Sequence, residues 1–514
     1  TRRCRPTATV QQLTTAAQEA ASALDADPSD AGRLAAAVTA QVEVQKGMRA
    51  AVAAEVLMAR RAWIKDGERP SKVLTALVHE PKDGGSGGGG PAQLHDPGTG
   101  QVTRDPSQLA QIIANFWRDV SAQPSEVELP TAVKQQAQAQ VLEALRLHPL
   151  RLPEDPEDRV GRLEVTSTEV AAALKATANG KAPGWDGLPA DLYKAFSRQF
   201  SPRLAHLFTA IGNTGNLPAR FTEGVIKVLY KKGDPMQPGN YRPITLLNTD
   251  YRTLAKVLAA RLGPALKTAI AAEQTAFLPD RLIGSNIFTL RHLPHLLRHQ
   301  GRAAVVAFLD FAKAYDTVHR DFLLKTMAEL GASEQLCKWV QILLTDTQAT
   351  AQVGGRTSQP VRMAAGVRQG CPLAPLLYLF VAQALLSWLQ RQGLGIRLDP
   401  TGGAHTTAVQ FADDGQVLLE GEDAVPVFLE AMETFAQAAG QRLNRDKVEL
   451  MWVGEVQPLQ QLQPSPPRQL AQPPRPHQAD PPSPAPPQPT LPPPNAQPHI
   501  SGLRIVPAAT ALGI

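Results

Sequence analysis

The chain has 514 residues, of which 43% are apolar, so it is long enough for two or three domains and is not disordered throughout. Three widely spaced cysteines argue against a disulfide framework or a structural zinc site, and they suit a reducing compartment. The net charge is only +5, yet the window 220–261 alone holds eight Lys or Arg against three Asp or Glu. This local excess suits a polyanion such as nucleic acid, although a solvated surface is the commoner explanation of a charged run.

The first 150 residues are expected to form a helical N-terminal extension followed by a segment that contains a linker. Residues 1–62 are rich in Ala, Gln and Val and predict one or two long helices, interrupted near residues 27–30. The glycine-rich stretch 83–91 predicts a loop or linker, and a second small segment extends to about residue 150. Because the sequence opens on Thr1, we expect a fragment of a longer protein.

The folded body extends from residue 164 to residue 454, where apolar residues alternate between helical and strand spacing. This mixture predicts an α+β domain. Residues 251–262 carry apolar side chains at helical spacing, whereas 304–311 is a short β-branched and aromatic run typical of a buried strand. Residues 455–499 are rich in Pro and Gln with few large apolar residues, so we expect them to be disordered.

The uncharged run 371–389 is about as long as a membrane span. Pro372, Pro375, Gln383 and Ser387 within it favour a buried core helix that begins at Pro372. We therefore expect no membrane association.

One carboxylate stands at the end of a predicted strand. Residues 305–309 would deliver Asp310 to the carboxyl end of that strand, where a helix cap is the simplest use for an aspartate. Asp316 and Thr317 are expected to cap the helix that follows, and Gly331 is expected to end it. The face of this helix is formed by Val318, Phe322, Met327 and Leu330.

Two further carboxylates stand in a predicted β-hairpin over residues 406–420, with Asp413, Asp414 and Gly415 at its centre. Asp-Gly explains a turn but not a second aspartate, because adjacent carboxylates repel each other unless a cation neutralises them. Oxygen ligands of this kind suit Mg²⁺, and a pair of ions could activate a 3′-hydroxyl and stabilise a leaving pyrophosphate.

Eight segments, in order and with fitting spacing, resemble the reverse transcriptases of non-long-terminal-repeat (LINE-type) retrotransposons over about residues 60–454. The palm-like motifs are LDFAKAYDTVHRDFL around Asp310, GVRQGCPLAPLLYLF from Gly366, QFADD around Asp413 and QRLNRDKVEL from Gln441. The finger-like and preceding segments are NGKAPGWDGLPADLYK from Asn179, IKVLYKKGDPMQPGNYRPITLLN from Ile226, EQTAFLPDRLIGSNI from Glu273 and WIKDGERPSK from Trp63.

The resemblance implies a right-hand polymerase fold without a thumb. Its parts would be a helical N-terminal extension (1–62), a linker-containing segment (63–150), fingers (160–300), palm (301–454), the disordered Pro/Gln-rich stretch (455–499) and a remnant of the primer-grip segment (500–514). The implied activity is RNA-directed DNA polymerisation with an RNA template, a DNA primer, deoxynucleoside triphosphates and two Mg²⁺ ions, with Mn²⁺ as a substitute. The expected location is the nucleus or a cytoplasmic ribonucleoprotein.

The resemblance also implies roles for individual residues. Asp310, Asp413 and Asp414 would be the catalytic triad and hold the metals together with the backbone carbonyl of Phe311. Tyr315 would exclude a ribose 2′-hydroxyl, and Lys447 would protonate the departing pyrophosphate. Nucleotide, template or phosphate contacts would come from Gln369, Gly370, Arg242, Lys231 and Lys232.

Other readings of these residues stay open. Tyr315 could serve core packing, 366–370 could be an ordinary turn, and Lys231, Lys232 and Lys447 could be solvated surface charges. For the whole chain, the alternatives are an inactive nucleic-acid-binding remnant of a retroelement, or a maturase of the group II intron type with its own RNA-binding extension.

Overall fold

In the computed structural model, the described residues are 90–125, 127–398, 405–454 and 499–505, with scattered positions between 12 and 43. The chain divides into two compact units, Thr1–Gly87 with Leu282–Gly284 and Gly88–Arg281 with Ser285–Ile514. In the first unit, the described positions from 12 to 43 are helical except Asp30. The sequence features outside the described residues are the segment 63–72, the glycine-rich residues 83–89, the Pro/Gln-rich residues 455–498 and the final residues 506–514.

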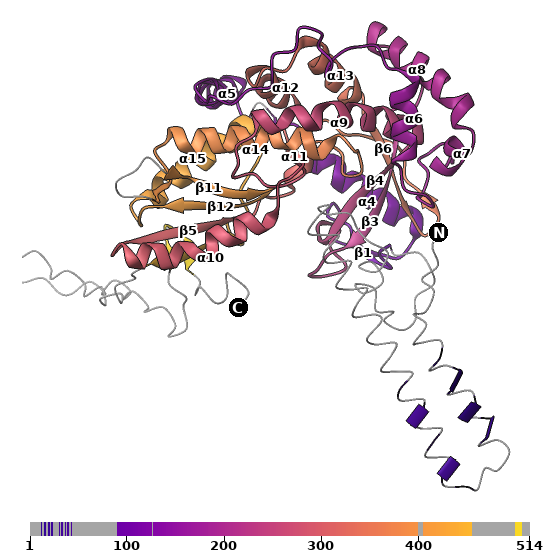
Figure 1. Ribbon diagram of the computed structural model, residues 1–514, viewed down its shortest axis with the longest axis horizontal. Coiled ribbons are helices and arrows are strands. Elements are labelled where there is room, and N and C mark those ends of the chain that lie inside the picture. The colour runs from indigo at the N-terminus through magenta and orange to yellow at the C-terminus, as the bar shows by residue number, and fades with distance from the viewer. Residues whose placement is uncertain are drawn as a thin grey trace, which may run out of the picture. The chain divides into compact units, whose positions relative to one another are not determined.

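From residue 90 on, helices and short strands alternate along the chain (Figure 1). The helices are α4 (Pro106–Val120), α5 (Thr131–Arg146), α6 (Ser167–Lys175), α7 (Ala190–Ala195), α8 (Ser197–Thr214), α9 (Thr249–Ala269), α10 (Ile283–His299), α11 (Ala314–Thr317), α12 (Arg320–Glu329), α13 (Glu334–Leu344), α14 (Ala374–Arg391) and α15 (Ala424–Ala439), with a 3-10 turn η1 (Pro238–Asn240). The strands are β1 (Leu94–His95), β2 (Val102–Thr103), β3 (Gly224–Tyr230), β4 (Tyr241–Leu247), β5 (Ala303–Leu309), β6 (Gln348–Val353), β7 (Arg356–Thr357), β8 (Val361–Arg362), β9 (Ile396–Arg397), β10 (His405–Thr406), β11 (Ala408–Phe411), β12 (Asp414–Leu419), β13 (Glu449–Gly454), β14 (His499–Ile500) and β15 (Leu503–Ile505).

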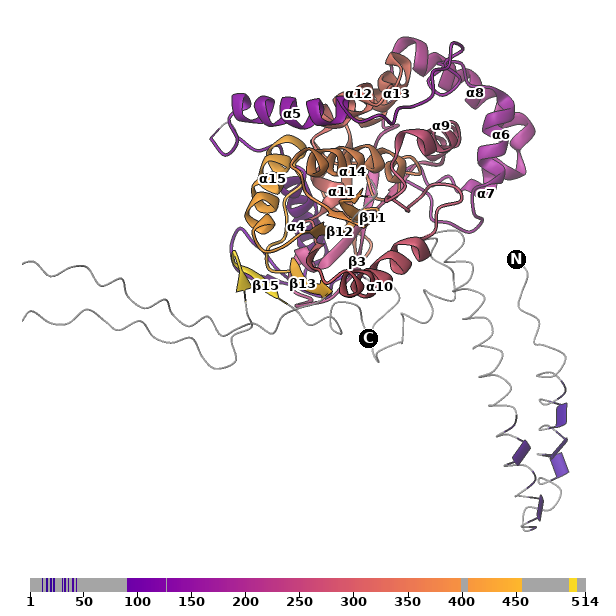
Figure 2. The same cartoon turned by 60° about the vertical axis from the view of Figure 1, so that its left-hand side comes forward.

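A six-stranded sheet in the order β11-β12-β5-β13-β15-β14 places β5 between two antiparallel neighbours. Side chains of β5 alternate between two cores, as the period of two in a strand requires. Val305, Ala307 and Leu309 pack into the main core with α14 and α15, whereas Ala304 and Val306 pack with α10. Figures 1 and 2 show α14 and α15 on one side of this sheet and α10 on the other. The strand is therefore buried on both faces, as its continuous apolar run predicts.

A second, five-stranded sheet is built on the β3-β4 hairpin, with β6 parallel to β3, and β7 and β8 both paired with β6. One face is covered by α4, whose Leu109, Ile113 and Trp117 share a core with Ile226 and Val228 of β3. Strands β6 to β8 come from residues 348–362, within the range expected to belong to the palm. A division of the chain at residue 300 therefore does not separate the two sheets, because residues 348–362 add strands to the five-stranded sheet.

Most of the elements expected from periodicity are present. The apolar face of 251–262 lies in α9 and is buried, and Val318, Phe322, Met327 and Leu330 are fully buried. Gly331, with a φ of +87°, follows α12 as a stop. The uncharged run 371–389 forms the buried α14, which begins at Ala374, two residues later than expected. Within the described part of the chain, every helix is too short or too polar to cross a bilayer.

One expected cap is wrong. Asp316 and Thr317 lie inside the short helix α11, and His319 occupies the N-cap position of α12 without a side-chain cap bond. The Asp316 side chain is buried and turns instead toward a loop some fifty residues further along the chain. Local sequence could not reveal that partner.

Candidate active site

Strand pairing brings the three predicted aspartates to one edge of the six-stranded sheet. Leu309 of β5 pairs with Gly415 of β12 in antiparallel register, so Asp310 and Asp414 occupy the next opposed positions. Asp413 lies in the turn that joins β11 to β12. Residues that are about a hundred positions apart in the sequence therefore meet through backbone pairing.

The predicted hairpin is present, but its turn lies earlier than the Asp-Gly dipeptide indicates. Phe411 pairs with Asp414, which leaves Ala412 and Asp413 as the two connecting residues. Ala412 has a φ of +59°, an uncommon conformation for a residue with a Cβ. Gly415 is part of the strand, and a Cβ there would come within 3.2 Å of the Leu309 side chain. The glycine thus serves close strand packing rather than the turn.

The electrostatics of the site follow from this placement. Burial, and then the charge of Asp310, raises the pKa of the Asp414 carboxyl, while Lys231 and Arg242 lower it. The Lys447 ammonium lies 3.0 Å from Asp310 Oδ2 in a half-exposed ion pair. Carboxylates and cations from both sheets therefore influence one another at this edge.

Backbone bonds place Lys447 beside Asp310. The amide of Ala312 donates to the Arg442 carbonyl at 2.9 Å, and the amide of Asn444 donates to the Asp310 carbonyl at 2.8 Å. The amide of Lys447 in turn donates to the Asn444 carbonyl at 2.9 Å. The loop that follows α15 is thus attached to the end of β5, which brings Lys447 beside Asp310.

The donor set suits a divalent cation, although no group of three or more His, Cys, Asp or Glu side chains converges on one point among the described residues. Asp310 and Asp414 offer oxygen ligands on opposed strand positions. The raised pKa of Asp414 reflects burial and repulsion by Asp310, and a bound cation would relieve that repulsion. The residues therefore fit a metal ion that binds between the carboxylates. Such an ion would compete with the Lys447 ammonium for Asp310.

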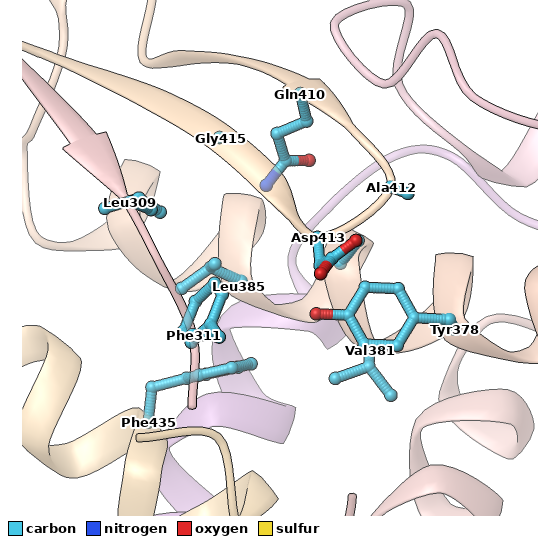
Figure 3. Close-up of a pocket in the computed structure, with 11 residues that line it drawn as sticks. Leu309, Phe311, Tyr378, Val381, Leu385, Gln410, Ala412, Asp413, Gly415 and Phe435 are labelled. Carbon is cyan, nitrogen blue, oxygen red and sulfur yellow. The ribbon is translucent and has the colours of Figure 1, made fainter. Parts of the chain in front are cut away.

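Tyr315 lies against a second tyrosine that sequence reasoning did not single out. Its ring stacks on that of Tyr378 in α14, with centroids 4.5 Å apart and planes 21° apart. The Tyr378 hydroxyl donates to Gln441 Oε1 at 3.0 Å, and Gln441 Nε2 donates to the Ala314 carbonyl at 2.7 Å. Figure 3 shows Tyr378 and Asp413 along the lining of one small cavity. Burial, followed by the charge of Asp413, raises the pKa of Tyr378, so this hydroxyl stays protonated.

The 366–370 loop is more than an ordinary turn. Gln369 Nε2 donates to Asp316 Oδ2 at 2.8 Å, and the Gln369 carbonyl accepts from the Thr245 amide of β4 at 2.8 Å. Gly370 has a φ of +113°, and a Cβ there would lie 2.3 Å from the Thr245 carbonyl oxygen. The close approach of the β4 backbone requires a glycine at this position.

The cations differ in how they are held. Arg242, Lys231 and Lys232 are exposed on the β3-β4 hairpin, and the charges of the first two reach Asp414. Lys313 is partly buried, and its ammonium donates to the Gly239 carbonyl at 2.6 Å. That ammonium also lies 4.7 Å from the Trp117 ring centroid of α4.

Four residues of this region were not assigned a role in the site from the sequence: Asp316, Lys313, Tyr378 and Gln441. Asp316 was read as a helix cap, and Gln441 opened a motif without a role of its own. Their partners are 53, 74 and 63 positions away in the Asp316–Gln369, Lys313–Gly239 and Tyr378–Gln441 pairs. Only the presence of all four within the quoted motifs could have signalled them.

Comparison with known proteins shows which family the sequence around this site resembles. Residues 230–471 match the family model described as reverse transcriptase (RNA-dependent DNA polymerase). The 149 kDa protein of transposon TX1 from Xenopus laevis is 31% identical over 301 residues, 58% of this chain and 23% of the relative. The Pol polyprotein of a type-1 R2 retrotransposable element from Popillia japonica is 30% identical over 288 residues, 55% of this chain and 38% of the relative.

A third relative, the Pol polyprotein of the R2DM element from Drosophila melanogaster, is 27% identical over 345 residues, 66% of this chain and 29% of the relative. The chain thus spans well under half of the length of each of these relatives. Residues 230–471, which match the family model, include Asp310 and the Asp413–Asp414 pair. The chain carries a reverse transcriptase domain of the kind found in non-long-terminal-repeat retrotransposons.

Proposed function

We propose that this chain is the polymerase core of an enzyme that copies RNA into DNA during retrotransposition. The observation that carries the proposal is the opposition of Asp310 and Asp414 at one sheet edge, with Asp413 in the adjoining turn. These carboxylates lie within a domain whose family has the right-hand polymerase fold and copies an RNA template from a primer with deoxynucleoside triphosphates. The six-stranded sheet would form most of the palm and the five-stranded sheet most of the fingers.

In this proposal Asp310, Asp413 and Asp414, with the Phe311 carbonyl, hold two Mg²⁺ ions, with Asp310 and Asp413 as the most direct ligands. The ions would activate the primer 3′-hydroxyl and stabilise charge on the leaving pyrophosphate. Lys447 supports this assignment because its ammonium already lies within hydrogen-bond distance of Asp310. An ammonium so placed can protonate pyrophosphate after a small shift.

The incoming nucleotide would lie between the aspartates of the six-stranded sheet and the basic residues of the five-stranded sheet. Arg242 and Lys231, whose charges act on Asp414, would bind the triphosphate or the template backbone, and Lys232 would add charge nearby. Tyr315 would exclude a 2′-hydroxyl from its stacked position on Tyr378. Gln369 and Gly370 would contact the nucleotide or the template base.

The test is primer extension on an RNA template, with Mg²⁺ present or removed by a chelator. We expect Asp310→Asn and Asp413→Asn each to lower extension by at least about a hundredfold, because removing a ligand charge forfeits several kcal/mol of transition-state stabilisation. Thermal unfolding should be little changed. Asp423→Asn is the matched control, since this exposed aspartate follows the far end of β12 and its side chain makes no cap bond. Near-normal extension by either active-site variant would overturn the proposal.

A further inference from the structure

Asp316 is a buried carboxylate without a role in the proposed chemistry. Its side chain is 8% exposed, and it lies in α11, directly after Tyr315. Burial raises the pKa of Asp316 to about 7, with partial relief from Gln369 and Lys313. A buried ionisable group is costly unless it is bonded, and the bond here is the one to Gln369. A site that could have held an apolar residue therefore holds a hydrogen-bond acceptor.

Backbone contacts tie the Tyr315 segment to the loop that carries Gln369. The Val367 amide donates to the Tyr315 carbonyl at 2.8 Å, and the Gly366 amide donates to the Val318 carbonyl at 2.8 Å. A Cβ on Gly366 would lie 2.5 Å from the Asp316 carbonyl oxygen, and its φ is +79°. The two segments are thus in direct backbone contact, with no space for a side chain between them.

The other side of Gln369 is held by the five-stranded sheet. Its carbonyl accepts from the Thr245 amide, and Gly370 lies against the Thr245 carbonyl. Thr245, Asp316 and Gln369 line one small cavity at this joint. The Gln369 backbone is therefore fixed by β4, and the orientation of its carboxamide depends on Asp316.

When its carboxyl is ionised, above its pKa of about 7, Asp316 can only accept hydrogen bonds, so it fixes which end of the carboxamide faces it. With Nε2 directed at Asp316, the Oε1 of Gln369 must face away from the carboxylate. We propose that Asp316 is a positioning residue that orients the Gln369 carboxamide for the incoming nucleotide and couples it to Tyr315. The inference rests on the proposed polymerase function and assigns Asp316 no contact with the substrate.

Steady-state primer extension at varied deoxynucleotide concentration tests the coupling. We expect Asp316→Ala to raise KM for the nucleotide by roughly tenfold with kcat changed by less than about threefold, since binding rather than chemistry loses its preorganisation. Asp316→Asn should raise KM less, because an amide can still accept from Nε2 but no longer dictates the orientation. This conservative variant also keeps the test decisive if Asp316→Ala folds poorly.

A double-mutant cycle separates positioning from packing. If Asp316 acts through Gln369, Asp316→Ala combined with Gln369→Ala should have the KM of Gln369→Ala alone. Additive effects on KM would overturn the inference, as would an unchanged KM in Asp316→Ala. Gln138→Ala serves as the control, because Gln138 is a buried, hydrogen-bonded amide on α5 that no part of the proposal uses.

The readouts distinguish this inference from the function on which it rests. A wild-type chain that extends a primer, together with an Asp316→Ala variant of normal KM, would overturn only the positioning role. A wild-type chain without any Mg²⁺-dependent extension would overturn the proposed function and this inference with it. A fall in stability alone, with KM unchanged in both Asp316 variants, would reduce Asp316 to a structural group.

Discussion

The two sheets present their charged residues in opposite ways. In the six-stranded sheet, β5 is buried on both faces, and the carboxylates stand at the ends of strands that are paired on each side. In the five-stranded sheet, the outer end of β3 is open, with Leu229 43% and Tyr230 51% exposed, and the basic residues lie on this open hairpin. The strand that carries Asp310 is thus fixed by packing on both faces, whereas the basic side chains of the hairpin are exposed to solvent.

The difference has a physical reason. Carboxylates that repel each other stay together only if the surrounding structure forces them to, which requires a strand whose position is fixed on both faces. Lys and Arg reach phosphates through long side chains and gain from remaining hydrated until a ligand arrives. The exposed outer end of such a hairpin also opens more readily than a strand that is buried on both faces. We therefore expect the aspartates to determine the rate of the chemical step. The basic hairpin is expected to determine how tightly the nucleotide or the template binds.

Tyr315 offers the largest effect after the aspartates, because its ring is held in place by Tyr378. We expect Tyr315→Ala to raise ribonucleotide incorporation relative to deoxynucleotide incorporation by roughly ten- to a hundredfold, through loss of a steric barrier worth about 1–3 kcal/mol. Competitive incorporation assays measure this ratio. Tyr315→Phe, which keeps the ring, is the control and should retain discrimination. If the ratio is unchanged while stability falls, Tyr315 serves only core packing. Selection against ribonucleotides could then not be assigned to the residues around the six-stranded sheet.

Arg242 tests the exposed side. Arg242→Ala should raise KM for the nucleotide about three- to tenfold and leave thermal unfolding unchanged, because an exposed cation contributes to ligand binding but little to folding. The log-log slope of binding against salt should fall by about 0.7–0.9 for each lost phosphate contact. Arg356→Ala, on the exposed strand β7, removes the same charge from the same sheet and serves as control. A large loss of stability in Arg242→Ala would contradict the contrast between the two sheets.

Glu169 provides the smallest effect and lies in neither sheet. Burial alone would raise the pKa of Glu169, but bonds from Arg261 and Thr166 outweigh it and lower the pKa to about 2. The folded-state pKa is therefore below the ordinary 4.5, so this stabilisation is present above pH 4.5 and disappears as the pH falls toward 2. Glu169→Gln should cost roughly 1 kcal/mol at pH 7, mainly through the lost ion pair with Arg261, because glutamine can still complete the capping box with Thr166.

Denaturant unfolding at pH 7 and near pH 3 measures the Glu169 effect. The wild type and Glu169→Gln should differ more at the higher pH and converge at the lower one. An equal difference at both would mean that the ion pair does not supply the stabilisation. KM for the nucleotide should not change, because the pair joins α6 to α9 away from both charged edges.

Elements whose causes are local could be predicted from the amino-acid sequence alone. Eight motifs in order along about residues 60–454 indicated the family, whereas the elements followed from local patterns: apolar runs specified β5, α9 and α14, and the spacing of Val318 to Leu330 specified the buried face of α12. These features depend on residues within one or two turns or strand periods of each other, which is the range over which periodicity carries information.

The tertiary structure settles which distant groups meet. It placed the hairpin turn at Ala412 and Asp413, and it paired Gly415 of β12 with Leu309, where a Cβ would lie 3.2 Å from the Leu309 side chain. It placed β6 to β8 in the five-stranded sheet, since strand pairing is set by the register of β3 rather than by order along the chain. It turned Asp316 from an expected cap into a partner of Gln369, 53 residues away. A hydrogen bond between segments this far apart depends on how sheets and loops pack, and no local pattern encodes it.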